Sequence, residues 1–183
     1  TGFTNNAAIE LTNLFASAYG SQLTVTAGTL TNAPGATITT LGGTAPGGLR
    51  TLAAQLDNQG TLTLNVPLTL DRASAAHTNS GTIDASLASL TLTQTGTAPS
   101  FTNTGMVTIG TGQTWTTSGG TLTNASTPSV GVIRGSGTLN VSGASLDLTG
   151  NLSNATLTLV ATSATINGPG TLTNVTGQTL NFR

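Results

Sequence analysis

The sequence predicts an all-β protein, a single-stranded right-handed parallel β-helix (β-solenoid) of about eight or nine coils. Three observations lead to this prediction. One strand-like frame returns along the chain, Thr provides 41 of the 183 residues, and helix-forming patterns are almost absent. Because Thr is β-branched, it favours an extended backbone. The return of the same strand, without two-residue hairpin turns between unlike strands, favours parallel coils over an antiparallel sandwich.

The repeated frame consists of a large or aromatic residue, an Asn, a Gly or Ala, and two aliphatic residues at alternating positions. Four copies occupy residues 3–11, 56–64, 77–85 and 101–109. A shorter Gly-Thr-Leu form occurs at 28–30, 120–122, 137–139 and 170–172, with Ala155-Thr156-Leu157 as a related copy. The scattered spacing fits solenoid coils whose corners vary in length.

Each copy alternates apolar and polar residues with the period of a β-strand, as in Thr61-Leu62-Thr63-Leu64 and Thr156-Leu157-Thr158-Leu159. Gly and Asn before the strand are expected to supply left-handed turn conformations. The aliphatic positions are expected to share one face and to stack inside the coil. They are Leu62, Leu64, Ile83, Val107, Ile109, Leu122, Leu139, Val141, Leu157, Leu159 and Leu172.

The whole chain, residues 1–183, is expected to form one solenoid domain and to be a piece of a longer repetitive protein. Short helical or irregular excursions are expected near 9–19 and 41–56. Ile9 to Tyr19 carries apolar residues at spacings that allow a short helix, and Leu49 to Leu56 is a weaker candidate.

Asn residues return at one position of the frame. Asn58, Asn79 and Asn103, with Asn5 as a fourth, precede the Gly or Ala position by two. Stacked side-chain amides hydrogen-bond between neighbouring parallel strands in other assemblies. We therefore expect these four residues to form a structural ladder at a corner of the solenoid.

The charge content excludes several classes of function. Four Arg, no Lys and a formal net charge of −1 leave no basic surface for nucleic acid. No apolar run is long enough to insert into a membrane. Because the chain has no Cys, thiolate metal sites are excluded, and we expect no metal and no cofactor.

Few residues are suited to catalysis, and we expect the protein not to be an enzyme. His77 replaces Leu56 and Phe101 in the frame, which indicates a corner or core residue. Glycosidases need two nearby carboxyl groups, and Asp57, Asp71 and Asp84 are the only candidates close enough in sequence. A carbohydrate-active β-helix enzyme or a carbohydrate-binding module is therefore the first alternative.

A second alternative is an ice-binding solenoid that uses outward Thr-x-Thr strands. Such a surface needs a regular array of Thr on a flat parallel face. The candidate exposed residues are Thr29, Thr31, Thr61, Thr63, Thr121, Thr123, Thr156, Thr158, Thr171 and Thr173. Glu10, Asp84 and Met106 occupy equivalent positions and interrupt the array, so ordinary strand-surface Thr is the favoured interpretation.

The segments Asn58-Gln59-Gly60-Thr61-Leu62, Asn79-Ser80-Gly81-Thr82-Ile83 and Gly135-Ser136-Gly137-Thr138-Leu139-Asn140-Val141 resemble repeats of bacterial β-helical exoproteins. These are the filamentous-haemagglutinin-like proteins and the autotransporter passenger domains. The resemblance implies an extracellular or bacterial cell-surface location and a role as a stalk, fibre or adhesin. The expected partners are other copies, contacted through terminal coils or lateral faces, and a host surface or polysaccharide.

Overall fold

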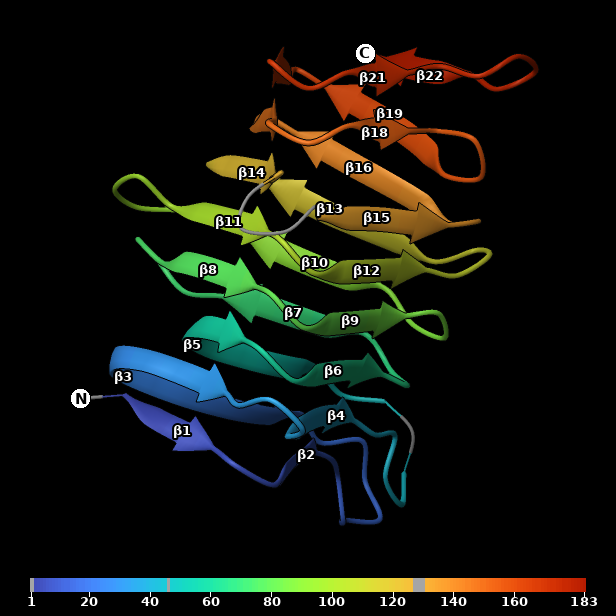
Figure 1. The fold of residues 1–183 in the computed structure, drawn as a ribbon. Helices are drawn as coiled ribbons and strands as arrows, with labels where there is room; N and C mark the ends of the chain where they lie inside the picture. The colour runs from blue at the N-terminus through green and yellow to red at the C-terminus, as the bar shows by residue number, and fades with distance from the viewer. Residues whose placement is uncertain (1, 46, 127–130) are drawn as a thin grey trace.

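A computed structural model describes residues 2–45, 47–126 and 131–183. In this part of the chain every regular element is a strand, and parallel strands stack into a β-solenoid of about seven turns. Figure 1 shows the coils piled from the N-terminus at the bottom to the C-terminus at the top. The predicted all-β parallel solenoid is therefore confirmed, and the expected eight or nine coils are close to the observed number.

Each coil contributes one strand to each of three faces. The first face holds β1 (Phe3–Asn5), the end of β3 (Ser21–Asn32), the end of β5 (Arg50–Asn58), β8 (Ala76–Asn79), β11 (Ser100–Asn103), β14 (Thr121–Asn124), β17 (Ser145–Leu148) and β20 (Thr165–Asn167). The second face holds β2 (Ala8–Leu11), β4 (Thr37–Thr40), β6 (Thr61–Leu64), β9 (Thr82–Ala85), β12 (Met106–Ile109), β15 (Val132–Gly135), β18 (Leu152–Ser153) and β21 (Leu172–Thr173). The third face holds the start of β3, the start of β5, β7 (Leu68–Asp71), β10 (Leu90–Thr93), β13 (Thr114–Ser118), β16 (Thr138–Ser142), β19 (Thr158–Thr162) and β22 (Leu180–Phe182).

We number the coils 1 to 8 by their first-face strands, from β1 to β20. β3 and β5 each run from the third face of one coil to the first face of the next, so faces one and three form a single 14-stranded sheet. Pairing is parallel and in register from coil to coil, apart from a register shift between Thr24 and Thr29 in the β3–β5 pair. At about 4.8 Å per step, the stack is about 34 Å long.

Burial follows the strand period. In β6, Leu62 and Leu64 point inward and are essentially buried, while Thr61 and Thr63 remain half-exposed on the outside. The inward aliphatic side chains of all three faces join in one continuous core. Because each coil covers the apolar surface of the next, burial is distributed along the rod and does not depend on a central globule.

One sequence-based expectation about the core is wrong, and of the two forms expected for the excursions the structure shows the irregular one. The aliphatic residues do not share one face, because Leu62 lies on the second face, Leu122 on the first and Leu139 on the third. Among the described residues of the two expected excursions, none forms a helix. Residues 12–20 and the described part of 41–49 are irregular, and residues 50–56 belong to strand β5.

The corner between the first and second faces needs Gly for a reason other than left-handed backbone. Gly60, Gly81 and Gly105 are not among the residues with positive φ. A Cβ on Gly81 would instead lie 2.1 Å from the Gly60 carbonyl oxygen of the coil below, and one on Gly105 would lie 2.2 Å from Gly81 O. Close stacking of successive backbones at this corner therefore excludes any side chain.

Candidate functional site

A row of six Asn side chains runs along the corner that follows the first face. Each amide Nδ2 donates to the Oδ1 of the next Asn, over 2.8, 2.8, 2.7, 2.8 and 3.1 Å. The members are Asn5, Asn32, Asn58, Asn79, Asn103 and Asn124. All six are buried, so the hydrogen bonds within the row satisfy polar groups that solvent does not reach.

The same Asn residues also fix the corner backbone. Nδ2 of Asn58 donates to the Thr82 carbonyl oxygen at 3.0 Å. The Asn58 carbonyl oxygen in turn accepts from the main-chain N–H groups of Ser80 and Gly81, at 2.9 and 3.0 Å. Each Asn therefore holds the turn of the following coil through both its side chain and its main chain.

The row contains the four Asn residues chosen from the sequence and two that were missed. Asn32 was missed because four residues separate it from the next strand, so no Gly stands two positions later. Asn124 was missed because the Gly120 copy was aligned with strands of another face. The signal common to all six is simpler, an inward residue two positions before Asn, as in Leu30-Thr31-Asn32 and Leu122-Thr123-Asn124.

The ten candidate Thr residues do not form one array. Four lie on the first face (Thr29, Thr31, Thr121, Thr123). Thr61, Thr63 and Thr173 lie on the second face, and Thr171 directly precedes the second-face strand β21. Thr158 lies on the third face, and Thr156 precedes it outside the strand. On the second face, Thr37, Thr39, Thr61 and Thr63 do make a small block, paired Thr37 to Thr61 and Thr39 to Thr63. The block ends at Asp84, which pairs with Thr63 in the next coil.

His77 lies inside the solenoid, stacked between Leu56 and Phe101. Its ring is 6.2 Å from that of Phe101, which makes an edge contact with Trp115 at 5.3 Å. The Leu56 N–H donates to Nδ1 of His77 at 3.1 Å. Desolvation by burial lowers the pKa of His77 from 6.5 to about 4, so the imidazole is neutral at pH 7.

The carboxylates that the sequence offered as a catalytic pair lie on three different faces. Asp57 is on the first face, Asp71 on the third and Asp84 on the second. Asp57 accepts hydrogen bonds from Thr78 Oγ1 and Gln59 Nε2, each at 2.6 Å, and Asp84 accepts one from the Ser86 N–H at 3.0 Å. In the described part of the chain, no three His, Asp or Glu residues gather where they would hold a metal ion.

Arg50 is buried at the start of β5, in the interior column that continues with Leu68 and Leu90. Its guanidinium donates to main-chain carbonyl oxygens of the two irregular segments, 12–20 and 41–49, and of the strand before the first. The acceptors are Leu11, Tyr19, Leu41, Gly42, Gly47, Gly48 and Leu49, at 2.9 to 3.5 Å. One cation therefore holds both segments to the first two coils.

Those two segments present exposed apolar side chains. Leu14, Phe15, Tyr19 and Leu49 are each at least 60% exposed, and the rings of Phe15 and Tyr19 meet edge to face at 5.6 Å. Asn13 joins the segments, since its Nδ2 donates to the Ala45 carbonyl oxygen at 3.2 Å. We call this surface the loop patch. A shallow hollow of about 260 Å³ beside it is lined by Gly20, Ser21, Gln22, Leu49 and Thr51.

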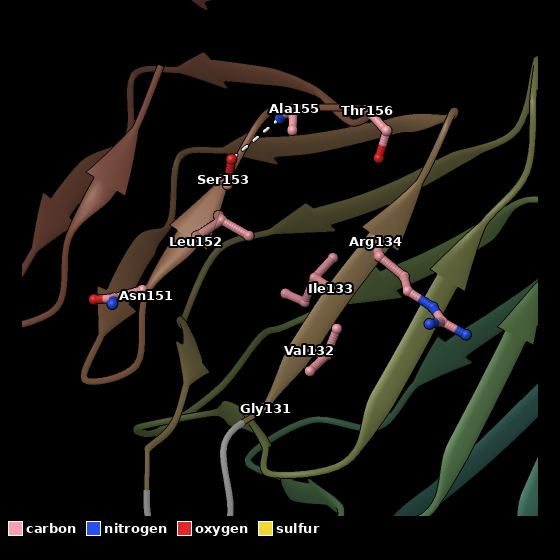
Figure 2. A pocket seen from close by; sticks show the side chains of 9 residues that line it. All are labelled: Gly131, Val132, Ile133, Arg134, Asn151, Leu152, Ser153, Ala155 and Thr156. Carbon is pink, nitrogen blue, oxygen red and sulfur yellow. Dashed lines mark hydrogen bonds between the residues drawn. The ribbon is translucent and has the colours of Figure 1, made fainter. Parts of the chain in front are cut away.

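A second hollow, of about 280 Å³, lies on the second face between coils 6 and 7. Figure 2 shows its lining, which comes from β15 and from β18 with the residues around it. Arg134 stands at its rim. Its Nε lies 3.5 Å from Thr108 Oγ1. Arg72, which follows β7, donates to the Val25 carbonyl oxygen at 2.9 Å and to that of Thr26.

Comparison with family models, with curated proteins and with solved structures finds no match for this chain. The described residues form no helix that is long and apolar enough to cross a membrane. The chain is a parallel β-solenoid of the repeat-protein type, and its distinctive features are the Asn row, the loop patch and the second-face hollow.

Proposed function

We propose that this chain is a structural and adhesive segment of a secreted or cell-surface bacterial protein, of the kind formed by filamentous-haemagglutinin-like exoproteins and autotransporter passengers. Its proposed role is to act as a rigid spacer that projects from the surface and to adhere to another surface through the loop patch. The observation that carries the proposal is the buried row of six hydrogen-bonded Asn residues, which continues from coil 1 to coil 6 without a charged group in it.

The spacing role is supported by how load passes along such a rod. From coil 1 to coil 6, each coil is joined to the next by main-chain ladders on its faces and by one Asn bond at the corner. Pulling along the axis therefore loads many hydrogen bonds of similar geometry in every step. A rod of this kind stays stiff without a dense set of surface charges, which agrees with the 5% charged residues of the chain.

Force spectroscopy tests the spacing role. The chain is held at Gly2 and Phe182 through terminal handles, and the wild type is compared with Asn79→Leu. We expect the wild type to resist extension and then to unfold in few large steps. The variant should unfold at coils 3 to 5 at a lower force. Gradual extension of the wild type at low force, one coil at a time, would contradict a spacer.

The adhesive role rests on the loop patch. Exposed apolar clusters on soluble domains commonly mark contact sites. Here the exposed aromatic rings of Phe15 and Tyr19 belong to the irregular segment that leads into the hollow lined by Gln22 and Thr51, and the cation that holds this segment, Arg50, is buried. Aromatic faces beside neutral hydrogen-bonding groups suit a neutral polysaccharide, so we propose that class as the surface contacted.

Adhesion to immobilised neutral polysaccharides tests this role, with a protein-coated surface as the second arm. We expect Phe15→Ser with Tyr19→Ser to lower retention about tenfold or more, the equivalent of about 1.4 kcal/mol. Leu87→Ser is the matched control, because Leu87 is 70% exposed on a different loop. Retention on the protein surface alone, or equal retention by both variants, would contradict the proposal.

The carbohydrate-cleaving alternative has its own test. Asp57→Asn, Asp71→Asn and Asp84→Asn are combined in one variant and assayed for depolymerisation of the same polysaccharides. A structural role expects neither protein to cleave them. A wild-type activity that the triple variant loses would overturn the structural proposal.

A further inference from the structure

The outward positions of the second face form two regular columns. Its first six strands, from β2 to β15, pair in register, so equivalent residues of successive coils lie one above the other, as Figure 1 shows. The charged column contains, from coil 1 to coil 6, Glu10, Thr39, Thr63, Asp84, Thr108 and Arg134. The neutral column contains, in the same order, Ala8, Thr37, Thr61, Thr82, Met106 and Val132.

The charged column carries opposite charges at its two ends. Glu10 and Arg134 are both exposed and lie five strands apart, about 24 Å at 4.8 Å per step, which is too far for an ion pair within one chain. In the described strands of the first and third faces, the outward positions carry Asp57, Asp147 and Asp71 but no cation. The second face is therefore the face whose described strands present both signs of charge.

A second copy of the chain complements this column. A two-fold axis parallel to the strands turns the second rod end for end, so that coil 1 faces coil 6, coil 2 faces coil 5 and coil 3 faces coil 4. Each column then faces its own copy across the gap of about 10 Å that separates packed sheets. Glu10 of each copy faces Arg134 of the other copy. Thr63 faces Asp84, and a Thr hydroxyl is a donor for a carboxylate.

The neutral column fits the same arrangement. Ala8 faces Val132, and Thr37 faces Met106. Val132 is 41% exposed and Met106 is half-exposed, so covering them removes apolar surface from water. No charged group of this column is placed against an apolar one, because all six of its residues are uncharged.

The other two-fold arrangement, with its axis along the rod, places every coil against its own copy. The two Glu10 residues then share one pair of coils and the two Arg134 residues share another, so like charges approach and no opposite charges meet. In the end-for-end arrangement the two Asp84 carboxylates are offset by one coil. They lie about 11 Å apart, beyond the Debye length of about 8 Å at physiological salt. Charge complementarity therefore selects the antiparallel arrangement.

We propose that the second face binds a second copy of this chain, face to face and with the two rods antiparallel, through Glu10–Arg134 ion pairs at both ends of the contact. Six strands of four residues give a face of about 29 by 13 Å, which is smaller than a standard interface. The dimer is therefore weak and forms where the chain is concentrated. This lateral association goes beyond the proposed function and does not depend on the loop patch.

Sedimentation equilibrium of the whole chain tests the dimer, at protein concentrations from about 10 to 500 μM, the range suited to a weak interface. We expect a monomer–dimer equilibrium without larger species, and weaker association at high salt. Glu10→Arg and Arg134→Glu should each weaken dimerisation about tenfold or more. Each change creates two like-charged contacts, because both copies of the symmetric dimer carry it.

Combining the two changes separates contact between copies from any other effect. The double variant, Glu10→Arg with Arg134→Glu, should dimerise as the wild type does, because both ion pairs return with the charges exchanged. An equimolar mixture of the two single variants should form a heterodimer for the same reason, although each variant alone associates poorly. Failure of both the double variant and the mixture to recover association would overturn the proposal.

Two controls complete the test, and circular dichroism checks that every variant is folded. Asp71→Arg makes the same change of charge as Glu10→Arg on the third face and should leave dimerisation unchanged. Phe15→Ser with Tyr19→Ser should also dimerise as the wild type does. A monomer at every concentration, or open-ended polymers formed by end-to-end stacking, would overturn the proposal. So would a dimer that the loop-patch variant loses and the charge reversals leave intact.

Discussion

Coils 1 and 2 and coils 3 to 6 have the same three-faced cross-section, yet different side chains hold them. In coils 3 to 6 most of the described turns are short, and the corner is held by the repeated neutral amides of Asn58, Asn79, Asn103 and Asn124. Coils 1 and 2 share that row but also carry the two irregular segments, and a single cation, Arg50, collects their carbonyl oxygens. A regular corner is therefore held by a residue that recurs in every coil of the row, whereas the irregular segments are held by a residue that occurs at one position only.

The largest effect is expected from removing that cation. Arg50→Met keeps a long apolar stem but leaves several buried carbonyl oxygens without a donor. Unsatisfied buried groups cost about 1–3 kcal/mol each, and partial solvation of the loosened segments limits the total to about 4 kcal/mol. Denaturant unfolding measures the loss. Arg72→Met is the matched control and should cost about 1 kcal/mol, because Arg72 is only half-buried and donates to two carbonyl oxygens.

The middle of the Asn row is expected to be the next most sensitive position. Asn79→Leu removes the bonds to Asn58 and Asn103 at once and should cost about 3 kcal/mol of unfolding free energy. Asn124→Leu should cost only about 1 kcal/mol. Its Nδ2 lies 3.4 Å from the Asn151 carbonyl oxygen, and Leu148 already occupies the same column in the next coil. Equal costs at the two positions would show that the row does not act as a chain of bonds.

Acid should act on the middle coils through His77. The pKa is about 4 in the folded chain and about 6.5 when unfolded, so the unfolded state binds the proton first as the pH falls. The contribution is fully present above pH 6.5 and is lost progressively down to pH 4, by about 3 kcal/mol in total. His77→Leu should flatten this part of the pH profile of stability. It should also cost about 1 kcal/mol at pH 7, since the Leu56 N–H loses its acceptor.

The outer surface of the middle coils should be the least sensitive. Thr61→Val keeps the β-branched shape, and Thr61 is half-exposed on the second face. We expect a change within about 0.5 kcal/mol of unfolding free energy. A loss comparable to that of Asn79→Leu would mean that the outward hydroxyls are part of what holds the coils together.

The sequence could predict the fold because the repeated information is local. Alternation such as Thr61-Leu62-Thr63-Leu64 defines a strand with one buried side, and its return defines a stack. It could not predict which face each copy occupies. Short Gly-Thr-Leu copies begin strands on all three faces, so Leu122 and Leu139 look alike in sequence although they lie on different faces of the coil.

The distinctive positions were harder to find for a related reason. Asn32 and Asn124 sit in the same column as the other four Asn, but the turns after them differ in length, so an ungapped alignment does not include them. Arg50 carries no local signal, because its acceptors come from chain segments up to 39 residues away. The charged column of the second face likewise becomes visible only when the strands are assigned to faces.

The Asn row also bears on how such a chain can evolve. Within the row, each member bonds only to the member before and the member after it, and the donor always points towards the later coil. Duplicating or deleting one whole coil therefore restores the same contacts on both sides of the cut, whatever the length of its outer turns. A gene encoding such a rod can change its length by unequal recombination while the Asn row stays continuous.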